Sequence, residues 1–155
     1  MKTVKIIGCG ALGTYVAEQI IAGSAGEYEL VSVFDKFNVE KGKELAEKCN
    51  CAFHDNFEAF LAQHADLIIE LASAGAVKEY LPECVRVADI IVLSVGGLLD
   101  PEFLIRSKEI AKANGHKIYV AAGAIGGLDL VRTVSLCDDF SLTLKTTKPP
   151  KSLRG

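Results

Sequence analysis

Three glycines near the N-terminus have the spacing of a phosphate-binding turn. They are Gly8, Gly10 and Gly13 of the string GCGALG, which follows the apolar run 3–7 and opens the amphipathic stretch 11–22. In such a turn the first glycine permits a tight bend, and the second leaves room for a pyrophosphate. The third lets the following helix pack closely on the strand. The spacing and its context therefore predict binding of a dinucleotide.

Two further features fit the same ligand. The backbone N–H groups at the start of the helix, around Ala11 and Leu12, would face the phosphate charge. Asp35 lies 22 residues beyond Gly13, at the end of the run ELVSVF, where a carboxylate can accept hydrogen bonds from both hydroxyls of the adenosine ribose. It would also repel a 2′-phosphate, which favours NAD over NADP, although the neighbouring Lys36 could attract that phosphate. A methyltransferase or coenzyme A domain could share the glycine turn, but neither explains this spacing together with Asp35.

Small, uncharged loops follow three later apolar runs. Ligands of open α/β sheets bind beyond the carboxyl ends of the strands, so these loops should line the same crevice. Backbone groups in such loops suit a flat nicotinamide ring and its amide. The predicted cofactor contacts in them are Ala72 after the fourth run, Ser94 and Gly96 after the fifth, and Ala122, Gly123 and Ala124 after the sixth.

Other reactive groups form no clear pattern. Cys49 and Cys51 could be half of a zinc site, but the three histidines do not repeat a ligand spacing (His54, His64 and His116). The simpler interpretation is that the thiols are free, so we expect no metal site and assign no catalytic residue. Five cysteines, an odd number in a chain large enough to fold without bridges, indicate a reduced, cytosolic setting.

Apolar, β-branched runs alternate with segments of helical period along most of the chain. Such a pattern predicts βαβ units and an open, doubly wound, mostly parallel α/β sheet of the Rossmann type. Pro82 would kink the fourth helix or start a new one, and residues 140–146 alternate like an antiparallel strand. The expected strands are 3–7, 29–34, 51–53, 66–70, 89–94 and 117–121, and the expected helices are 11–22, 39–49, 57–62, 74–87, 101–113 and 128–136.

The composition restricts the class of protein. With 155 residues, 50% of them hydrophobic and 24% charged, the chain fits one globular domain. Its 17 basic and 20 acidic residues leave a net charge of −3 without a clear basic stripe, which argues against a nucleic-acid partner. The charge-free stretch 90–99 is about half of what a membrane span needs, and the start has no signal-peptide core. We therefore expect a cytoplasmic protein with a small-molecule ligand and without a membrane partner.

Several segments together resemble the L-aspartate dehydrogenase family. YVAAGAIGGLDLVR (119–132) is similar to the family's signature loop, and GAIGGLD is its most specific part. Stretches 6–18, 68–80 and 89–100 resemble family segments in the same order, and TTKPPKSL (146–153) resembles the passage out of the nucleotide domain. The resemblance implies an NAD(P)-dependent oxidoreductase that oxidises L-aspartate to iminoaspartate, with roles in amino-acid metabolism and NAD biosynthesis.

The resemblance also implies residue roles, and it shows departures. Ala122 and Val95 stand where the family often has serine and threonine, so any hydroxyl contact there is lost. Family members are longer and carry the catalytic histidine and a cofactor-binding asparagine in a second domain. The cofactor positions that it implies are the pyrophosphate loop at Gly8, Gly10 and Gly13, the ribose position at Asp35, and an NAD contact at Ala124.

One interpretation is preferred. We expect residues 1–145 to form an NAD(P)-binding domain and residues 146–155 to form a linker toward an absent catalytic domain, through which the protein could form homo-oligomers. Two alternatives remain open. One is a free-standing NAD-binding module that senses redox state or docks on another subunit, and the other is the first domain of a homoserine- or inositol-type dehydrogenase. The segment GAIGGLD favours the aspartate dehydrogenase over the latter.

Overall fold

The computed structural model describes residues 1–122, 128–137, 139–143, 145 and 147. The chain divides into two compact units, residues 1–121 and residues 122–155. The second unit holds the helix α6 (Leu128–Val134), shorter than the predicted helix 128–136. Gly123 and Ala124 lie outside the described residues, as does most of the predicted linker 146–155.

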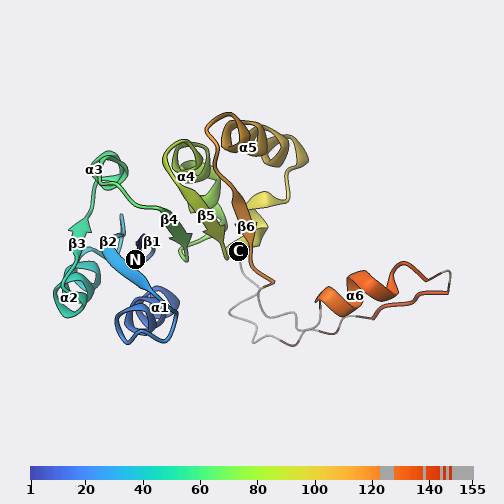
Figure 1. Ribbon diagram of the computed structural model, residues 1–155, viewed down its shortest axis with the longest axis horizontal. Coiled ribbons are helices and arrows are strands. Elements are labelled where there is room, and N and C mark those ends of the chain that lie inside the picture. Colours follow the sequence, from blue (N-terminus) through green and yellow to red (C-terminus); the bar gives the residue numbers. More distant parts are fainter. Residues whose placement is uncertain (123–127, 138, 144, 146, 148–155) are drawn as a thin grey trace. The chain divides into compact units, whose positions relative to one another are not determined.

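A parallel sheet forms the centre of the first unit (Figure 1). Its order is β3-β2-β1-β4-β5-β6, and all neighbouring strands are parallel. The order reverses between β1 and β4, as in the Rossmann fold, so the predicted fold class is confirmed. The strands are β1 (Lys2–Ile7), β2 (Tyr28–Phe34), β3 (Ala52–His54), β4 (Leu67–Glu70), β5 (Asp89–Val92) and β6 (Ile118–Val120).

Helices cover both faces of this sheet (Figure 1). One face carries α1 (Ala11–Ile21) and α2 (Val39–Cys49), and the other carries α3 (Phe57–Ala62), α4 (Ala74–Val87) and α5 (Pro101–Ala113). Successive side chains of a strand point to opposite faces. Ile6 therefore packs in the core under α1 and α2, whereas its neighbour Ile7 packs in the core under α3, α4 and α5. Burial of strands on both faces explains their nearly continuous apolar sequences.

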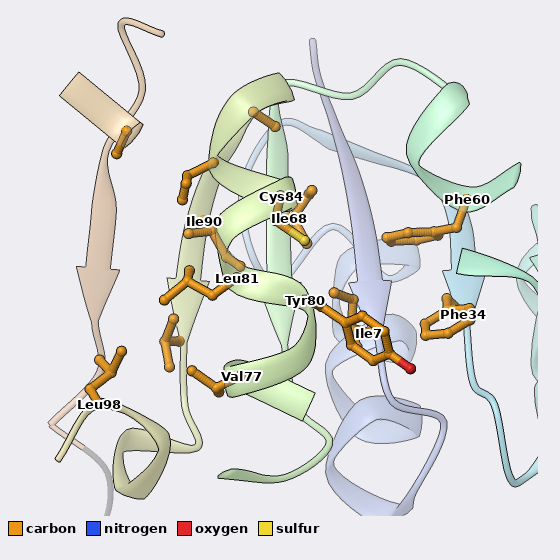
Figure 2. Packing of buried hydrophobic residues seen from close by; sticks show 14 of the residues in the cluster. Ile7, Phe34, Phe60, Ile68, Val77, Tyr80, Leu81, Cys84, Ile90 and Leu98 are labelled. Atoms are coloured by element: carbon orange, nitrogen blue, oxygen red, sulfur yellow. The ribbon is translucent and has the colours of Figure 1, made fainter. Parts of the chain in front are cut away.

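The core beneath α4 anchors that helix beside the carboxyl ends of β1 and β2. Figure 2 shows Tyr80 and Leu81 of α4 among side chains from the sheet. The Tyr80 ring meets the Phe34 ring edge-on, with 5.4 Å between centroids, and lies 4.1 Å from the Phe57 centroid. Such aromatic pairs add to the stabilisation from burial. They hold the middle of α4 close to the end of β2.

Three predictions about elements need correction. The predicted strand 89–94 ends at Val92, because the chain then turns into a 3₁₀ helix, η1 (Val95–Leu98). Pro82 neither kinks α4 into two helices nor starts a new one, and burial of Leu81 and Val85 keeps the helix on the sheet. Residues 140–143 and 145 are not in a strand, and none of the six described strands pairs with them.

Candidate functional site

The glycine turn between β1 and α1 has the geometry that its sequence predicted. Gly8 has a φ of +102°, and its N–H donates to the Phe34 carbonyl at 2.8 Å. A Cβ on Gly13 would lie 1.9 Å from the Gly8 carbonyl oxygen, so only glycine lets the helix approach the turn this closely. A Cβ on Gly10 would meet no atom within 4 Å. Gly10 thus faces open space, as required where a ligand phosphate is to approach the backbone.

The start of α1 is left without a side-chain cap. Gly10 is its N-cap residue and has no side chain to accept from the first N–H groups of the helix. The start of α2 likewise has no side-chain cap, whereas Asn56, Ser73 and Asp100 cap α3, α4 and α5 through side-chain oxygens. Ala11 and Leu12 form the exposed first turn of α1, as predicted for a phosphate-binding helix start.

Asp35 lies directly after β2 and is buried, with 7% of its surface exposed. Its Oδ2 accepts from the Cys9 N–H at 2.8 Å and from Asn38 Nδ2 at 3.0 Å. Its Oδ1 accepts from the N–H groups of Phe37 and Asn38 at 2.9 and 2.8 Å. Burial alone would raise the pKa of Asp35, but these hydrogen bonds favour the carboxylate and hold the pKa below its usual value. Asp35 is therefore an anion that ties the glycine turn to the loop after β2.

A cavity of about 400 Å³ opens beside Asp35. Its walls come from the turn after β1, the loop after β2, the loop after β4 and the first turns of α4. Burial, together with a hydrogen bond to Glu79 and the nearby charge of Asp35, raises the pKa of Tyr80 in its wall to about 12. Tyr80 therefore stays neutral at physiological pH. Besides Tyr80, residues that line the cavity include Gly8, Gly10, Asp35, Lys36, Phe37, Asn38, Ala72, Ser73 and Glu79.

Two residues that line the cavity, Lys36 and Glu79, form an ion pair. Lys36 Nζ lies 3.2 Å from Glu79 Oε1, which joins the loop after β2 to the second turn of α4. The same ammonium group lies 5.9 Å from the centroid of the Phe37 ring. Because both partners are about half exposed, the pair adds little to folding stability. The pair nevertheless holds the charged end of Lys36 against Glu79 at the wall of the cavity.

A second buried carboxylate joins the loops after β4 and β5. Glu70 is 1% exposed, and its Oε1 accepts from the N–H groups of Ala72 and Ser73 at 2.9 and 3.0 Å. Its Oε2 accepts from the Ser94 N–H at 3.0 Å. A charged acceptor strengthens such hydrogen bonds. One side chain therefore fixes two loops that were predicted to contact the cofactor.

Five of the thirteen predicted site residues line one cavity, and three more, Ala11, Leu12 and Gly13, lie in the first turn of α1. The five that line the cavity are Gly8, Gly10, Asp35, Lys36 and Ala72. Ser94 reaches that region only through Glu70, and Gly96 lies in η1. Ala122 belongs to the second unit, and the predicted contacts at Gly123 and Ala124 lie outside the described residues.

Sequence reasoning missed Glu70, Glu79 and Tyr80. A charged residue at the end of the apolar run DLIIE was a usable signal for Glu70, because a buried carboxylate needs backbone donors. Glu79 and Tyr80 gave no comparable signal, since their position relative to Lys36 depends on the packing of α4.

Other reactive side chains lie outside the cavity. All five cysteines are free. Within the described ranges, no group of three or more His, Cys, Asp or Glu side chains could hold a metal ion. In the same ranges, no helix is both long and apolar enough to cross a membrane. His54 Nε2 lies 2.9 Å from Gln63 Oε1, and His116 Nδ1 lies 3.0 Å from the Val85 carbonyl oxygen. Neither histidine lines the cavity.

A known protein family matches most of the chain. Residues 8–121 match the family described as "Homoserine dehydrogenase, NAD binding domain". The matched segment begins at the glycine turn and ends at the last residue of the first unit.

Similar individual proteins extend along the full chain. An L-aspartate dehydrogenase of Methanocaldococcus jannaschii is 32% identical over 99% of this chain and 57% of its own length. One of Methanococcoides burtonii is 35% identical over 100% of this chain and 57% of its own. The crystal structure of an aspartate dehydrogenase from Thermotoga maritima, 26% identical, superimposes with a TM-score of 0.64 over 86% of this chain and 51% of that one. The chain thus spans just over half the length of these relatives.

Proposed function

The chain belongs to the family of homoserine dehydrogenase NAD-binding domains, and from this premise we propose that it is the nucleotide-binding part of an L-aspartate dehydrogenase. One observation carries the proposal: the likeness to L-aspartate dehydrogenases runs through 99–100% of the chain at 32–35% identity. The alternative of a homoserine- or inositol-type enzyme has no support of that extent, although the family model carries the homoserine name. The alternative of a free-standing module gains no specific observation.

The residues around the glycine turn fit an NAD(P) pyrophosphate. Open space at Gly10 and the uncapped start of α1 leave N–H donors for a phosphate beside the turn. The cavity next to Asp35 would take the adenosine. When bound, the nicotinamide of the cofactor supplies the hydride acceptor.

To bind the ribose, Asp35 would give up one hydrogen bond from the protein and accept one from a ribose hydroxyl. Its carboxylate has about four acceptor sites, and four donors of the protein already use them. Three of these are backbone N–H groups, whereas the fourth is the side-chain amide of Asn38. In the complex a ribose hydroxyl replaces this amide on Oδ2, while the backbone donors keep Asp35 in place.

The proposal also covers the domain bounds, the substrate, the location and the assembly of the protein. Residues 1–145 form the cofactor-binding domain, and 146–155 form a linker. The substrate is a small dicarboxylic amino acid, and no catalytic residue is assigned within the described chain. A cytosolic location and homo-oligomers remain predictions.

Titration of the 155-residue chain with NADH and with NADPH tests the cofactor site. NADH should bind more tightly, because Asp35 accepts ribose hydroxyls and repels a 2′-phosphate. Replacing Asp35 with alanine should narrow the difference. Absence of NADH binding would contradict the proposed function, and equal affinities would show that Asp35 does not govern the adenosine end.

A further inference from the structure

Two adjoining cavities beside Asp35 are lined by several acidic side chains and one lysine. The cavity that Asp35 lines shares Lys36, Glu79 and Tyr80 with the second one, which is also lined by Asp55, Glu58 and Glu83. Among the described residues that line the two cavities, Lys36 is the single lysine or arginine. Whether this side chain is free or engaged therefore decides whether the region can hold an additional phosphate.

Lys36 occupies the position from which a cation would reach a ribose 2′-phosphate. It directly follows Asp35, whose carboxylate marks the ribose position of the proposed site. A lysine there would ordinarily offset the repulsion between the aspartate and a 2′-phosphate. In this structure its ammonium group is instead 3.2 Å from the Glu79 carboxylate, on a different element.

Glu79 itself is held in place by its helix. The neighbouring Tyr80 is buried against Phe34 and Phe57, which fixes this part of α4 on the core. The carboxylate is therefore presented to the cavity by α4 even though it is half exposed. Occupying Lys36 and adding a second negative charge both act against a phosphate.

We infer that Glu79 is a specificity-determining residue, which weakens binding of NADP relative to NAD at the adenosine site by engaging Lys36. The inference rests on the proposed function, since it places the adenosine of the cofactor beside Asp35. Glu79 should weaken binding of the 2′-phosphate alone. Because NADH has no such phosphate, its affinity should hardly depend on this side chain.

The direct test is Glu79→Gln, with NADH and NADPH affinities measured by calorimetric titration of the 155-residue chain. Glutamine keeps the size of the side chain and its hydrogen-bonding ability but releases the charge of Lys36. The ratio of NADPH to NADH affinity should rise by roughly fivefold, the scale of an exposed ion pair. Glu83→Gln is the matched control, because Glu83 lies one turn further along α4 and pairs with Arg86. This control should shift the ratio much less.

The same substitution in a chain that lacks Lys36 shows whether Glu79 acts through Lys36 or through its own negative charge. In a Lys36→Met chain, Glu79→Gln should lose most of its effect on NADPH. An equal effect in both backgrounds would overturn the assignment, because Glu79 would then act by its own charge alone. An unchanged ratio after Glu79→Gln in the wild-type background would overturn it as well. If the unsubstituted chain fails to bind NADH, the proposed function fails instead, so the two failures are distinguishable.

Discussion

Glu70 and Ser94 are joined across two strands of the sheet, with the Glu70 carboxylate accepting from the Ser94 N–H at 3.0 Å. The same carboxylate accepts from Ala72 and Ser73 in the loop after its own strand. Because β4 and β5 lie side by side with Glu70 next to Val92, the two loops start at the same edge. The Glu70 side chain thus links the loop after β4 to the loop after β5.

Replacing Glu70 with glutamine should weaken this link. The amide keeps one acceptor oxygen but turns an N–H donor toward one of the backbone N–H groups, which then has no acceptor. We expect the free energy of unfolding to fall by about 1–3 kcal/mol and NADH to bind more weakly, since Ala72 and Ser73 line the cavity. Urea unfolding and NADH titration measure the two effects. Glu29→Gln, at an exposed position on β2, is the control, and an equally small effect of both changes would contradict the assigned role.

Gly10 and Gly13 should respond differently to a side chain. Gly10→Val places its side chain in open space, so the fold should persist with a loss of at most about 1 kcal/mol at the helix cap. It should nevertheless abolish NADH binding, because the phosphate path is blocked. Gly13→Ala should destabilise the fold itself, since its Cβ would lie 1.9 Å from the Gly8 oxygen. Circular dichroism and NADH titration of both variants test this, and unchanged affinity in a folded Gly10→Val chain would refute the phosphate-loop assignment.

The stability of the fold should depend on pH through the titration of Lys5, a lysine buried in β1. Its Nζ donates to the carbonyl groups of Phe60 and Gln63 at 2.7 and 2.6 Å and lies 4.5 Å from the Phe60 ring centroid. Burial lowers the pKa of Lys5 to about 8, while the nearby Cys84 raises it slightly. Between this value and the ordinary pKa of 10.5, the unfolded chain binds a proton that the folded chain has released. Stability due to Lys5 therefore rises with pH in that window.

Comparison with a Lys5→Met variant isolates this effect. Burial raises the pKa of Cys9 and Cys84 to about 12, so the thiols lower the stability of both proteins as the pH exceeds 9. The difference in free energy of unfolding between wild type and variant should increase by about 1 kcal/mol from pH 8 to pH 9. Urea unfolding at several pH values measures it. A constant difference would mean that Lys5 titrates at its ordinary pKa.

The 155-residue chain alone should bind NAD but should not oxidise L-aspartate. Within the described residues that line the cavity, no histidine or arginine is present to act as a base or to hold two carboxylates. Orientation of the substrate is worth roughly 7–11 kcal/mol, and general-base catalysis about 100- to 10,000-fold. NADH formation with L-aspartate at alkaline pH measures turnover. A rate of about one per second or faster would contradict the prediction, and His54, His64 and Lys145 would then be the first residues to replace.

The sequence by itself determined the fold class and the glycine turn between β1 and α1. Both depend on local features: apolar runs that alternate with helical segments, and glycines at fixed spacing directly after the first strand. Helices α2, α3, α4 and α5 begin and end at the predicted residues, because their apolar periods are local and α3, α4 and α5 directly follow capping residues. The position of Asp35 at the end of β2 follows from the same local pattern.

Only the tertiary structure decided what these residues contact. The donors around Asp35 include Cys9, which is 26 residues away, and Lys36 meets Glu79 across 43 residues. Glu70 reaches Ser94 across 24 residues because parallel strands align their carboxyl ends. Such contacts depend on strand order and helix packing, and no periodicity within a segment encodes them. The sequence therefore predicted an acidic group for the ribose, whereas the engagement of its neighbouring lysine depended on how α4 packs against the sheet.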